Sequence, residues 1–389
     1  MTTPQGDIFS KRRDPAFPKP TAAQIFVAAG MRKLEQLLAA IVTCLLLAAP
    51  CAAAMRPALE EPYDSGWALY MDNDAFAPRG TDRDYTGGFS LTLAGRRARD
   101  GWWSLDGWRA AGDRLFGFDR LYADRAFSRH SMEVGLTVFN PGELGDPAKQ
   151  VGDRPYANLI YLSNTAAEVV PARDTAYLST FTLGVLGAPF IGNWQRSLHH
   201  AIGATVPRGW DRQISNGGEP TLRYAFARVR RVWRGKLGGF GGEVSTTWRG
   251  SVGYLTDASF GVATRIGKIR TSWWSYNPQI TEYAEKSLPA VASAGGGEER
   301  YFWTGFNVRA RAYNAFLQGQ FRHSDVTFSP GRLRPLTLEA WIGYTLAFRS
   351  GWRLSYALNV QSSEIRGGPA DRAERWGSIV VAYAPSSRR

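Results

Sequence analysis

Residues 129–140 read RHSMEVGLTVFN, and apolar side chains alternate with small or polar ones along most of this stretch. Successive side chains of a β-strand point to opposite faces, so a period of two predicts a strand with one apolar and one polar face. The apolar face would carry Met132, Val134, Leu136 and Val138. Such a strand suits an antiparallel sheet whose two sides lie in different media.

The same period recurs along the chain and predicts about twelve strands. We expect them near residues 65–72, 84–94, 129–139, 157–169, 174–186, 220–234, 243–255, 259–270, 302–314, 335–348, 352–365 and 375–384. The chain also holds 14 Trp, 16 Tyr and 20 Phe, several of them near strand ends. We therefore predict an all-β fold, a transmembrane antiparallel β-barrel of about 12 strands. A soluble β-sandwich or lipocalin-like barrel is the alternative, but it would expose Trp and Tyr less freely.

The amino-terminal residues predict export across the inner membrane. Met31-Arg-Lys is followed by the apolar run LLAAIVTCLLLAAPCAAA, which ends in small residues. This pattern is typical of a signal peptide, here over residues 31–54, with residues 1–30 as an upstream extension outside the mature protein. The outer-membrane domain would then be residues 55–389. A membrane-anchoring helix is the alternative, but the apolar run is short for a bilayer.

Cysteine usage and charge narrow the possible functions. Both cysteines, Cys44 and Cys51, fall within the predicted signal peptide, so the mature chain would have no disulfide, thiol nucleophile or thiolate ligand. The full chain has a formal charge of +13, and it stays basic without residues 1–54. For an exported protein this charge favours an anionic lipid surface as the partner, and no nucleic acid. We expect a monomer.

The order of the strands predicts which connections face outward. If the amino end of the barrel lies in the periplasm, the connections after odd-numbered strands are external. Two connections on the periplasmic side, residues 95–128 and 271–301, are long for turns. We expect small helices there that plug or cap the barrel.

The third external connection, within residues 186–219, predicts a short helix. It contains FIGNWQRSLHHAIGATVPRGW, and four apolar residues recur in it at helical spacing: Ile191, Trp194, Leu198 and Ile202. On a helical wheel His199 borders this apolar stripe, whereas His200 points nearly opposite. A helix packed against the barrel would hold His199 near the wall and leave His200 towards water.

The first external connection is acidic. Residues 70–88 read YMDNDAFAPRGTDRDYTGG, in which an asparagine stands among four aspartates: Asp72, Asn73, Asp74, Asp82 and Asp84. Clustered carboxylate and amide oxygens suit Ca²⁺, although the spacing is not that of an EF-hand. A solvated acidic turn is the alternative. Alternation along the second strand places Thr86 on its polar face near the outer end, and Tyr85 on the opposite face with Phe89.

Four short motifs in this order resemble one family. They are NDAF at residues 73–76, TDRDYTGG at 81–88, GDRPYA at 152–157, and HHAIGA followed by PRGWDRQI within 199–214. They resemble the outer-membrane lipid A 3′-O-deacylase family (LpxR-type), and the resemblance runs from about Trp67 to the end of the chain.

The resemblance implies a function and a site. The family removes the 3′-O-linked acyl or acyloxyacyl group of lipid A, and a Ca²⁺-assisted attack by water is proposed for it. Carried onto this chain, His199 would be the catalytic base, Asn73 and Asp74 would bind Ca²⁺, and Thr86 would contact the ester or the water. The family's prototype has a glutamate six residues after the histidine, where this chain has Thr205.

The expected partner is lipid A or lipopolysaccharide in the outer leaflet of the outer membrane. Its phosphates need cations, for which Lys149 and Arg154 are candidates, ordinary surface charge being the alternative for both. Two other functions stay open: a porin or structural barrel, and an outer-membrane phospholipase that uses Ser215. The phospholipase pattern is incomplete, because Gln213 stands where its histidine would be.

Overall fold

The computed structural model describes residues 61–385 except 79, 81, 149, 276–282, 284–285 and 287–296. These residues belong to one compact unit, Ala53–Arg389. The predicted signal peptide and the upstream extension lie outside the described residues. No helix in the described part of the chain is long and apolar enough to cross a bilayer.

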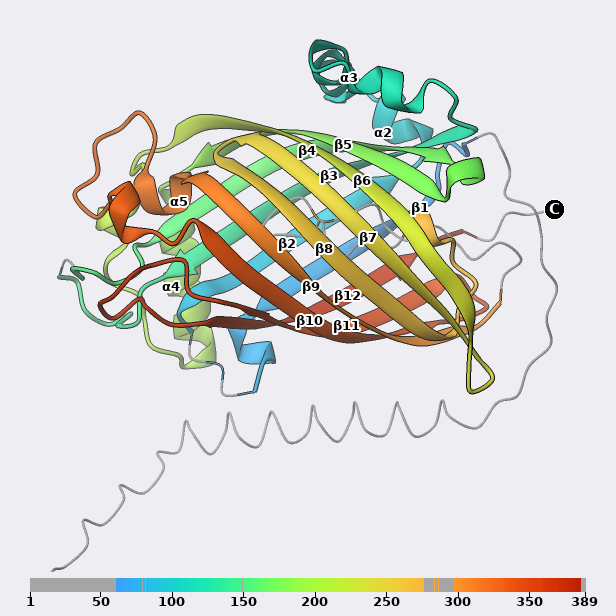
Figure 1. The fold of residues 1–389 in the computed structure, drawn as a ribbon. Helices are drawn as coiled ribbons and strands as arrows, with labels where there is room; N and C mark the ends of the chain where they lie inside the picture. Colours follow the sequence, from blue (N-terminus) through green and yellow to red (C-terminus); the bar gives the residue numbers. More distant parts are fainter. Residues whose placement is uncertain are drawn as a thin grey trace, which may run out of the picture. The chain divides into compact units, whose positions relative to one another are not determined.

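Twelve antiparallel strands close into a barrel in which each strand pairs with its neighbours in sequence and β1 pairs with β12 (Figure 1). The strands are β1 (Gly66–Asn73), β2 (Asp84–Ala94), β3 (Phe127–Asn140), β4 (Ala157–Val170), β5 (Thr175–Leu186), β6 (Glu219–Leu237), β7 (Phe240–Gly253), β8 (Leu255–Lys268), β9 (Glu299–Asn314), β10 (Leu336–Ala347), β11 (Trp352–Gln361) and β12 (Glu374–Tyr383). The predicted fold class is confirmed, and every predicted strand overlaps an observed one.

The two faces of the wall differ as the alternation predicts. Exposed large side chains on the outside include Val134, Leu183, Trp248, Phe306 and Ile342. The inner face carries buried charges, many of them in ion pairs. An apolar belt around a polar interior is the arrangement that a lipid bilayer requires of a barrel.

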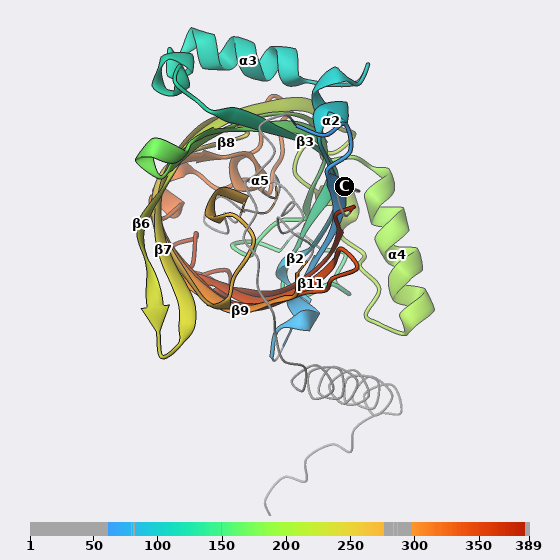
Figure 2. The same ribbon diagram turned by 90° about the vertical axis from the view of Figure 1, so that its right-hand side faces the viewer.

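Part of the long connection between β8 and β9 lies inside the barrel. Trp273 and Trp274 pack against inward-facing residues of β4, β5 and β6, and Figure 2 shows this segment within the ring of strands. Further along, Tyr283 packs among Tyr85, Phe139 and other lumen residues, and Lys286 forms an ion pair with Asp72. The prediction that this connection plugs the barrel therefore holds for its described residues.

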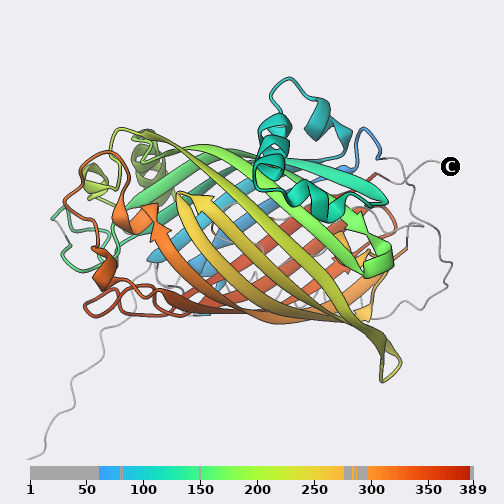
Figure 3. The same cartoon turned by 45° about the horizontal axis from the view of Figure 1, so that its top comes forward.

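The other long connection, between β2 and β3, does not plug the barrel. It contains α2 (Arg96–Asp100), α3 (Asp106–Leu115) and the 3-10 helix η2 (Phe118–Tyr122), which lie outside the strands at the end of the barrel where β1 begins and β12 ends (Figures 2 and 3). We expected a plug or a cap from its length alone. The segment instead bonds to polar residues on the outer face of β5 and β6, such as Ser179 and Tyr224.

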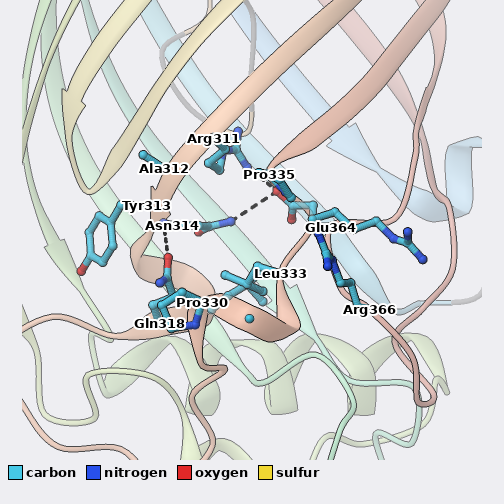
Figure 4. A pocket seen from close by; sticks show the side chains of 13 residues that line it. Arg311, Ala312, Tyr313, Asn314, Gln318, Pro330, Leu333, Pro335, Glu364 and Arg366 are labelled. Carbon is cyan, nitrogen blue, oxygen red and sulfur yellow. Dashed lines mark hydrogen bonds and ion pairs between the residues drawn. The ribbon is translucent and has the colours of Figure 1, made fainter.

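The opposite end of the barrel carries α4 (Phe190–Ile202) and α5 (Ala315–Gln318). Both chain termini of the barrel lie at the α3 end, which is the periplasmic end of a single-chain outer-membrane barrel. The α4 end is therefore external. The four-residue helix α5 borders a cavity of about 310 Å³, where Arg311 and Asn314 both donate hydrogen bonds to Glu364 (Figure 4).

Candidate active site on the outside of the barrel wall

Helix α4 packs against the barrel, as predicted, and lies on its outside, but Ile191 is the one residue of its apolar stripe that is buried. Its buried residues are Ile191, Gly192, Gln195 and His199, whereas Trp194, Leu198 and Ile202 are exposed. Gly192 permits the close approach, because a Cβ there would lie 2.6 Å from the Trp210 ring. The Trp210 indole donates a hydrogen bond to Gln195 Oε1 at 2.8 Å, which fixes the rotation of the helix. His199 consequently faces the wall and His200 faces solvent.

The end of α4 orients the imidazole of His199. The chain turns at Gly203, whose φ of 69° is left-handed, and brings the Thr205 carbonyl to 2.7 Å from His199 Nδ1. A carbonyl oxygen can only accept, so Nδ1 carries the proton and Nε2 keeps its lone pair. Nε2 makes no hydrogen bond to the described residues. The ring is thus prepared to accept a proton at Nε2.

A carboxylate lies beside the same imidazole. Asp82 Oδ2 is 3.7 Å from His199 Nδ1, and Asp82 Oδ1 accepts a hydrogen bond from Asn140 Nδ2 at 3.5 Å. Burial raises the pKa of Asp82, and the neighbouring His199 opposes that rise. The sequence placed Asp82 only within the acidic cluster that could bind Ca²⁺ and gave it no role beside His199. The sequence analysis did not select Asn140, which lies at the end of β3. The strand register pairs Asn140 with Asp84 and so brings it to this site.

The Asn73-Asp74 pair forms the turn that leaves β1. Asn73 Oδ1 accepts the Ala75 N–H at 2.7 Å and so caps the 3-10 helix η1 (Asp74–Phe76). The Asn73 amide also lies close to Gly87. A Cβ added to Gly87 would be 3.3 Å from Asn73 Nδ2, so alanine at position 87 would crowd the amide. Asp74 Oδ2 accepts the Arg83 N–H at 2.8 Å, which ties the two ends of the acidic connection together. Burial, reinforced by the nearby Asp82, raises the pKa of Asp74 to about 7.

Thr86 reaches the site through a β-bulge. The register between β2 and β3 shifts between Tyr85 and Gly87, which leaves Thr86 as the extra residue. Tyr85 turns into the lumen, where its hydroxyl donates to Asp72 Oδ2 at 2.8 Å. The predicted alternation is therefore wrong for Tyr85, because a bulge interrupts the period of two. Thr86 itself is buried at the level of Asn73 and Asn140.

Three buried oxygens in this region lack a donor among the described residues: Asp74 Oδ1, Thr86 Oγ1 and Asn140 Oδ1. They come from the external ends of β1, β2 and β3. These ends lie side by side, because Asn73 pairs with Gly87 and Asp84 pairs with Asn140. A buried acceptor without a partner is costly, and a hard cation is bound by such oxygens. No group of three or more acidic, histidine or cysteine side chains with metal-site geometry occurs within the described ranges. The residues therefore fit Ca²⁺ held by one carboxylate and neutral oxygens.

Other predicted residues lie away from this region. Arg154 is 2 % exposed and points into the barrel, where it forms ion pairs with Glu364 at 2.6 Å and with Glu374. Arg154 is thus not available to bind substrate phosphates, and that prediction is wrong. Its position in an external connection suggested that it is exposed, but its ion pairs with carboxylates in the lumen keep it buried. Lys149 lies outside the described residues. Ser215 is fully buried and donates a hydrogen bond to Glu219 Oε2 at 2.8 Å, an arrangement that does not suit a nucleophile.

Comparisons with known proteins place this arrangement in context. The model of the family described as outer membrane protein LpxR matches residues 38–384. The solved structure of LpxR from Salmonella typhimurium is 17 % identical, with a TM-score of 0.62 over 82 % of this chain and 99 % of that chain. The β domain of the Bordetella autotransporter BrkA, 10 % identical over 83 % of this chain and 99 % of that one, reaches a TM-score of only 0.37. No curated protein matches the sequence significantly.

Proposed function

Because the chain belongs to the outer membrane protein LpxR family, we propose that it is a lipid A deacylase that hydrolyses the 3′-O-linked acyl or acyloxyacyl ester of lipopolysaccharide. One observation carries this proposal: an oriented histidine with a free Nε2 lies beside unpartnered buried oxygens, on the outer face of the barrel at its external end. An ester in the outer leaflet can reach that position from the side, without entering the lumen.

The exposed apolar residues of α4 support a lipid substrate. Phe190, Trp194, Leu198 and Ile202 are between 43 % and 62 % exposed, although they lie next to the candidate base. A helix that turns its apolar side chains outward is stable in contact with acyl chains and unfavourable in water. The same side chains would hold acyl groups of the substrate near His199.

The cations for lipid A phosphates would come from residues that sequence reasoning did not select. Arg83 and Arg208 are exposed, and their guanidinium groups make no bond to other described residues. Both belong to the connections that form the site, through the Arg83 N–H bonded to Asp74 and the Arg208 N–H bonded to the Leu144 carbonyl. They can therefore pair with phosphate without giving up an existing partner.

His199 would act as the general base. Its Nε2 takes a proton from a water molecule, the water oxygen attacks the ester carbonyl, and the imidazolium then returns the proton to the departing sugar alkoxide. The Thr205 carbonyl would accept the Nδ1–H throughout, and the Asp82 carboxylate, 3.7 Å from Nδ1, would stabilise the imidazolium through its charge. Asp82 is thus the proposed positioning residue, in a chain that lacks the glutamate of the family's prototype.

The remaining residues would stabilise the developing oxyanion. Asp74, Thr86 and Asn140 would hold Ca²⁺, which when bound supplies Lewis-acid stabilisation of the carbonyl oxygen. Asn73 uses its Oδ1 to cap η1, so its Nδ2 is left as a hydrogen-bond donor. We propose this donor role for Asn73 in addition to the cation-binding role implied by the resemblance.

Mass spectrometry of lipid A tests the reaction. Lipid A from outer membranes that contain the protein should lose the mass of the 3′-linked acyl group when Ca²⁺ is supplied, and the loss should stop with a chelator. Lipid A of unchanged mass in the presence of folded protein and Ca²⁺ would rule out the enzymatic function. Liposome swelling distinguishes a porin, for which the lumen residues Trp273 and Tyr283 leave little room.

A further inference from the structure

The segment outside the barrel at its periplasmic end binds the wall through polar groups. Arg109 of α3 donates to Asp113 at 2.5 Å and to Ser179 of β5 at 2.7 Å. Asp113 also accepts the hydroxyls of Tyr122 and of Tyr224 on β6. These groups are buried, so the polar side of α3 is the side that packs on the barrel.

The apolar side of the same segment is left exposed. Trp102 is 96 % exposed, Trp108 66 % and Leu115 80 %. In water this orientation of a helix would be reversed, with the apolar residues against the wall. The exposed side therefore indicates contact with lipid, at the level where the segment meets the barrel (Figure 3).

An aromatic groove of about 330 Å³ lies between this segment and the wall. It is lined by Phe116 and Phe118 on one side and by Tyr224, Phe226, Trp248 and Val252 on the other. The Phe118 and Phe226 rings stack with their centroids 4.0 Å apart, and Phe116 and Tyr224 are 5.3 Å apart. Gly250 faces open space, since a Cβ added there would meet nothing within 4 Å. The volume and the largely aromatic lining of the groove suit an acyl chain.

Basic residues follow the groove towards the periplasm. Along the outer face of β6, Leu222, Tyr224 and Phe226 give way to Arg228 and Arg230, and Arg228 lines the groove. Both arginines are exposed and form no ion pair with any residue that the structure describes. The neighbouring residues 114–120 include two exposed arginines, Arg114 and Arg120, and one half-buried acid, Asp119. The surroundings of the groove are therefore basic. This change from aromatic to basic marks the depth at which acyl chains end and headgroups begin.

We propose that this groove binds an anionic glycerophospholipid of the periplasmic leaflet. One acyl chain lies along Phe118 and Phe226, and the headgroup phosphate pairs with Arg228 and Arg230. The groove is separate from the candidate active site, which lies at the opposite end of the barrel. The proposal is therefore independent of the proposed deacylation.

Native mass spectrometry of the full mature chain in detergent tests the proposal. The probes are phosphatidylglycerol and phosphatidylethanolamine with the same acyl chains, added separately and in competition. We expect one phosphatidylglycerol molecule to be retained with about tenfold preference, because the two arginines favour the net negative headgroup. Equal retention of the two lipids by the wild type would overturn the proposal.

Two variants locate the bound lipid. Gly250→Phe adds a ring to the groove from a β7 position at which an added Cβ meets nothing within 4 Å. We expect this variant to lose the phosphatidylglycerol while it keeps its heat-modifiable mobility in electrophoresis and its action on lipid A. The double variant Arg228→Gln/Arg230→Gln should retain both lipids equally, and Arg375→Gln, an exposed arginine of β12, should behave as the wild type. If both groove variants kept the wild-type preference for phosphatidylglycerol, the lipid would bind elsewhere and the proposal would be wrong. Joint loss of lipid binding and deacylation in Gly250→Phe would assign the groove to the substrate instead.

Discussion

Replacing Asp82 with asparagine removes the negative charge beside His199 and keeps the size of the side chain. The Asp82 carboxylate lies 3.7 Å from Nδ1, a distance at which a full charge pair is worth about 1 kcal/mol in water and about 4 kcal/mol at an effective dielectric constant of 20. The Asp82 side chain is 33 % exposed, so solvent screening favours the lower part of that range. With about 1–2 kcal/mol lost, the hydrolysis rate should fall roughly five- to thirtyfold.

The assay is the release of fatty acid from lipid A micelles by purified protein at saturating Ca²⁺. We expect kcat to fall and KM to change little, because Asp82 would stabilise the imidazolium and would not bind substrate. Asp211→Asn is the matched control, since Asp211 is an exposed acid in the connection that follows α4 and should leave the rate unchanged. A higher Ca²⁺ concentration should not restore the activity of Asp82→Asn. It would restore activity if the substitution had removed a Ca²⁺ ligand.

A double-mutant comparison separates positioning from folding. In a His199→Ala background Asp82→Asn should cause no further loss, because the group that it positions is gone. An equal fractional loss in both backgrounds would refute the reasoning, and so would a wild-type rate for Asp82→Asn alone.

The other predictions concern the base and the oxygens. His199→Ala should lower deacylation about 10²- to 10⁴-fold, whereas the exposed His200→Ala should nearly match the wild type in lipid A mass spectra. Thr86→Val should raise the Ca²⁺ concentration needed for half activity, and Thr86→Ser should not, with electrophoretic mobility as the check on folding. Burial raises the pKa of Asp74 to about 7, so below that pH a proton competes with Ca²⁺ for its carboxylate. In the wild type the Ca²⁺ concentration that gives half of the maximal activity should therefore fall as the pH rises from 6 to 8. Asp74→Asn should bind Ca²⁺ weakly and lose this pH dependence.

The strands could be predicted from the sequence because a membrane barrel imposes a period of two on every strand. Helical spacing predicted that α4 packs against the barrel with His199 towards the wall, but it did not predict that Trp194, Leu198 and Ile202 face away from the barrel. The Thr86 bulge could not be predicted in this way, since Asp84, Tyr85 and Thr86 fit a regular alternation and only the pairing with β3 reveals the extra residue. Asn140 was missed for the same reason, because its closeness to Asp82 depends on register.

Charged residues were harder to place than apolar ones. Arg154 looked exposed because it lies in an external connection, yet its partners Glu364 and Glu374 come from a part of the chain more than 200 residues away. Alternation also says nothing about a segment such as α3, whose polar side packs on the wall. Its orientation depends on a buried network that joins Arg109 and Asp113 to Ser179 and Tyr224.

The segment held inside the barrel has a consequence for the cell envelope. The outer membrane keeps toxic solutes out, and a cylinder with a water-filled centre would admit them. Trp273, Trp274, Tyr283 and Lys286 occupy part of that interior, so the described residues of this connection narrow the path of a solute, and the proposed reaction on the outer face would not use the lumen.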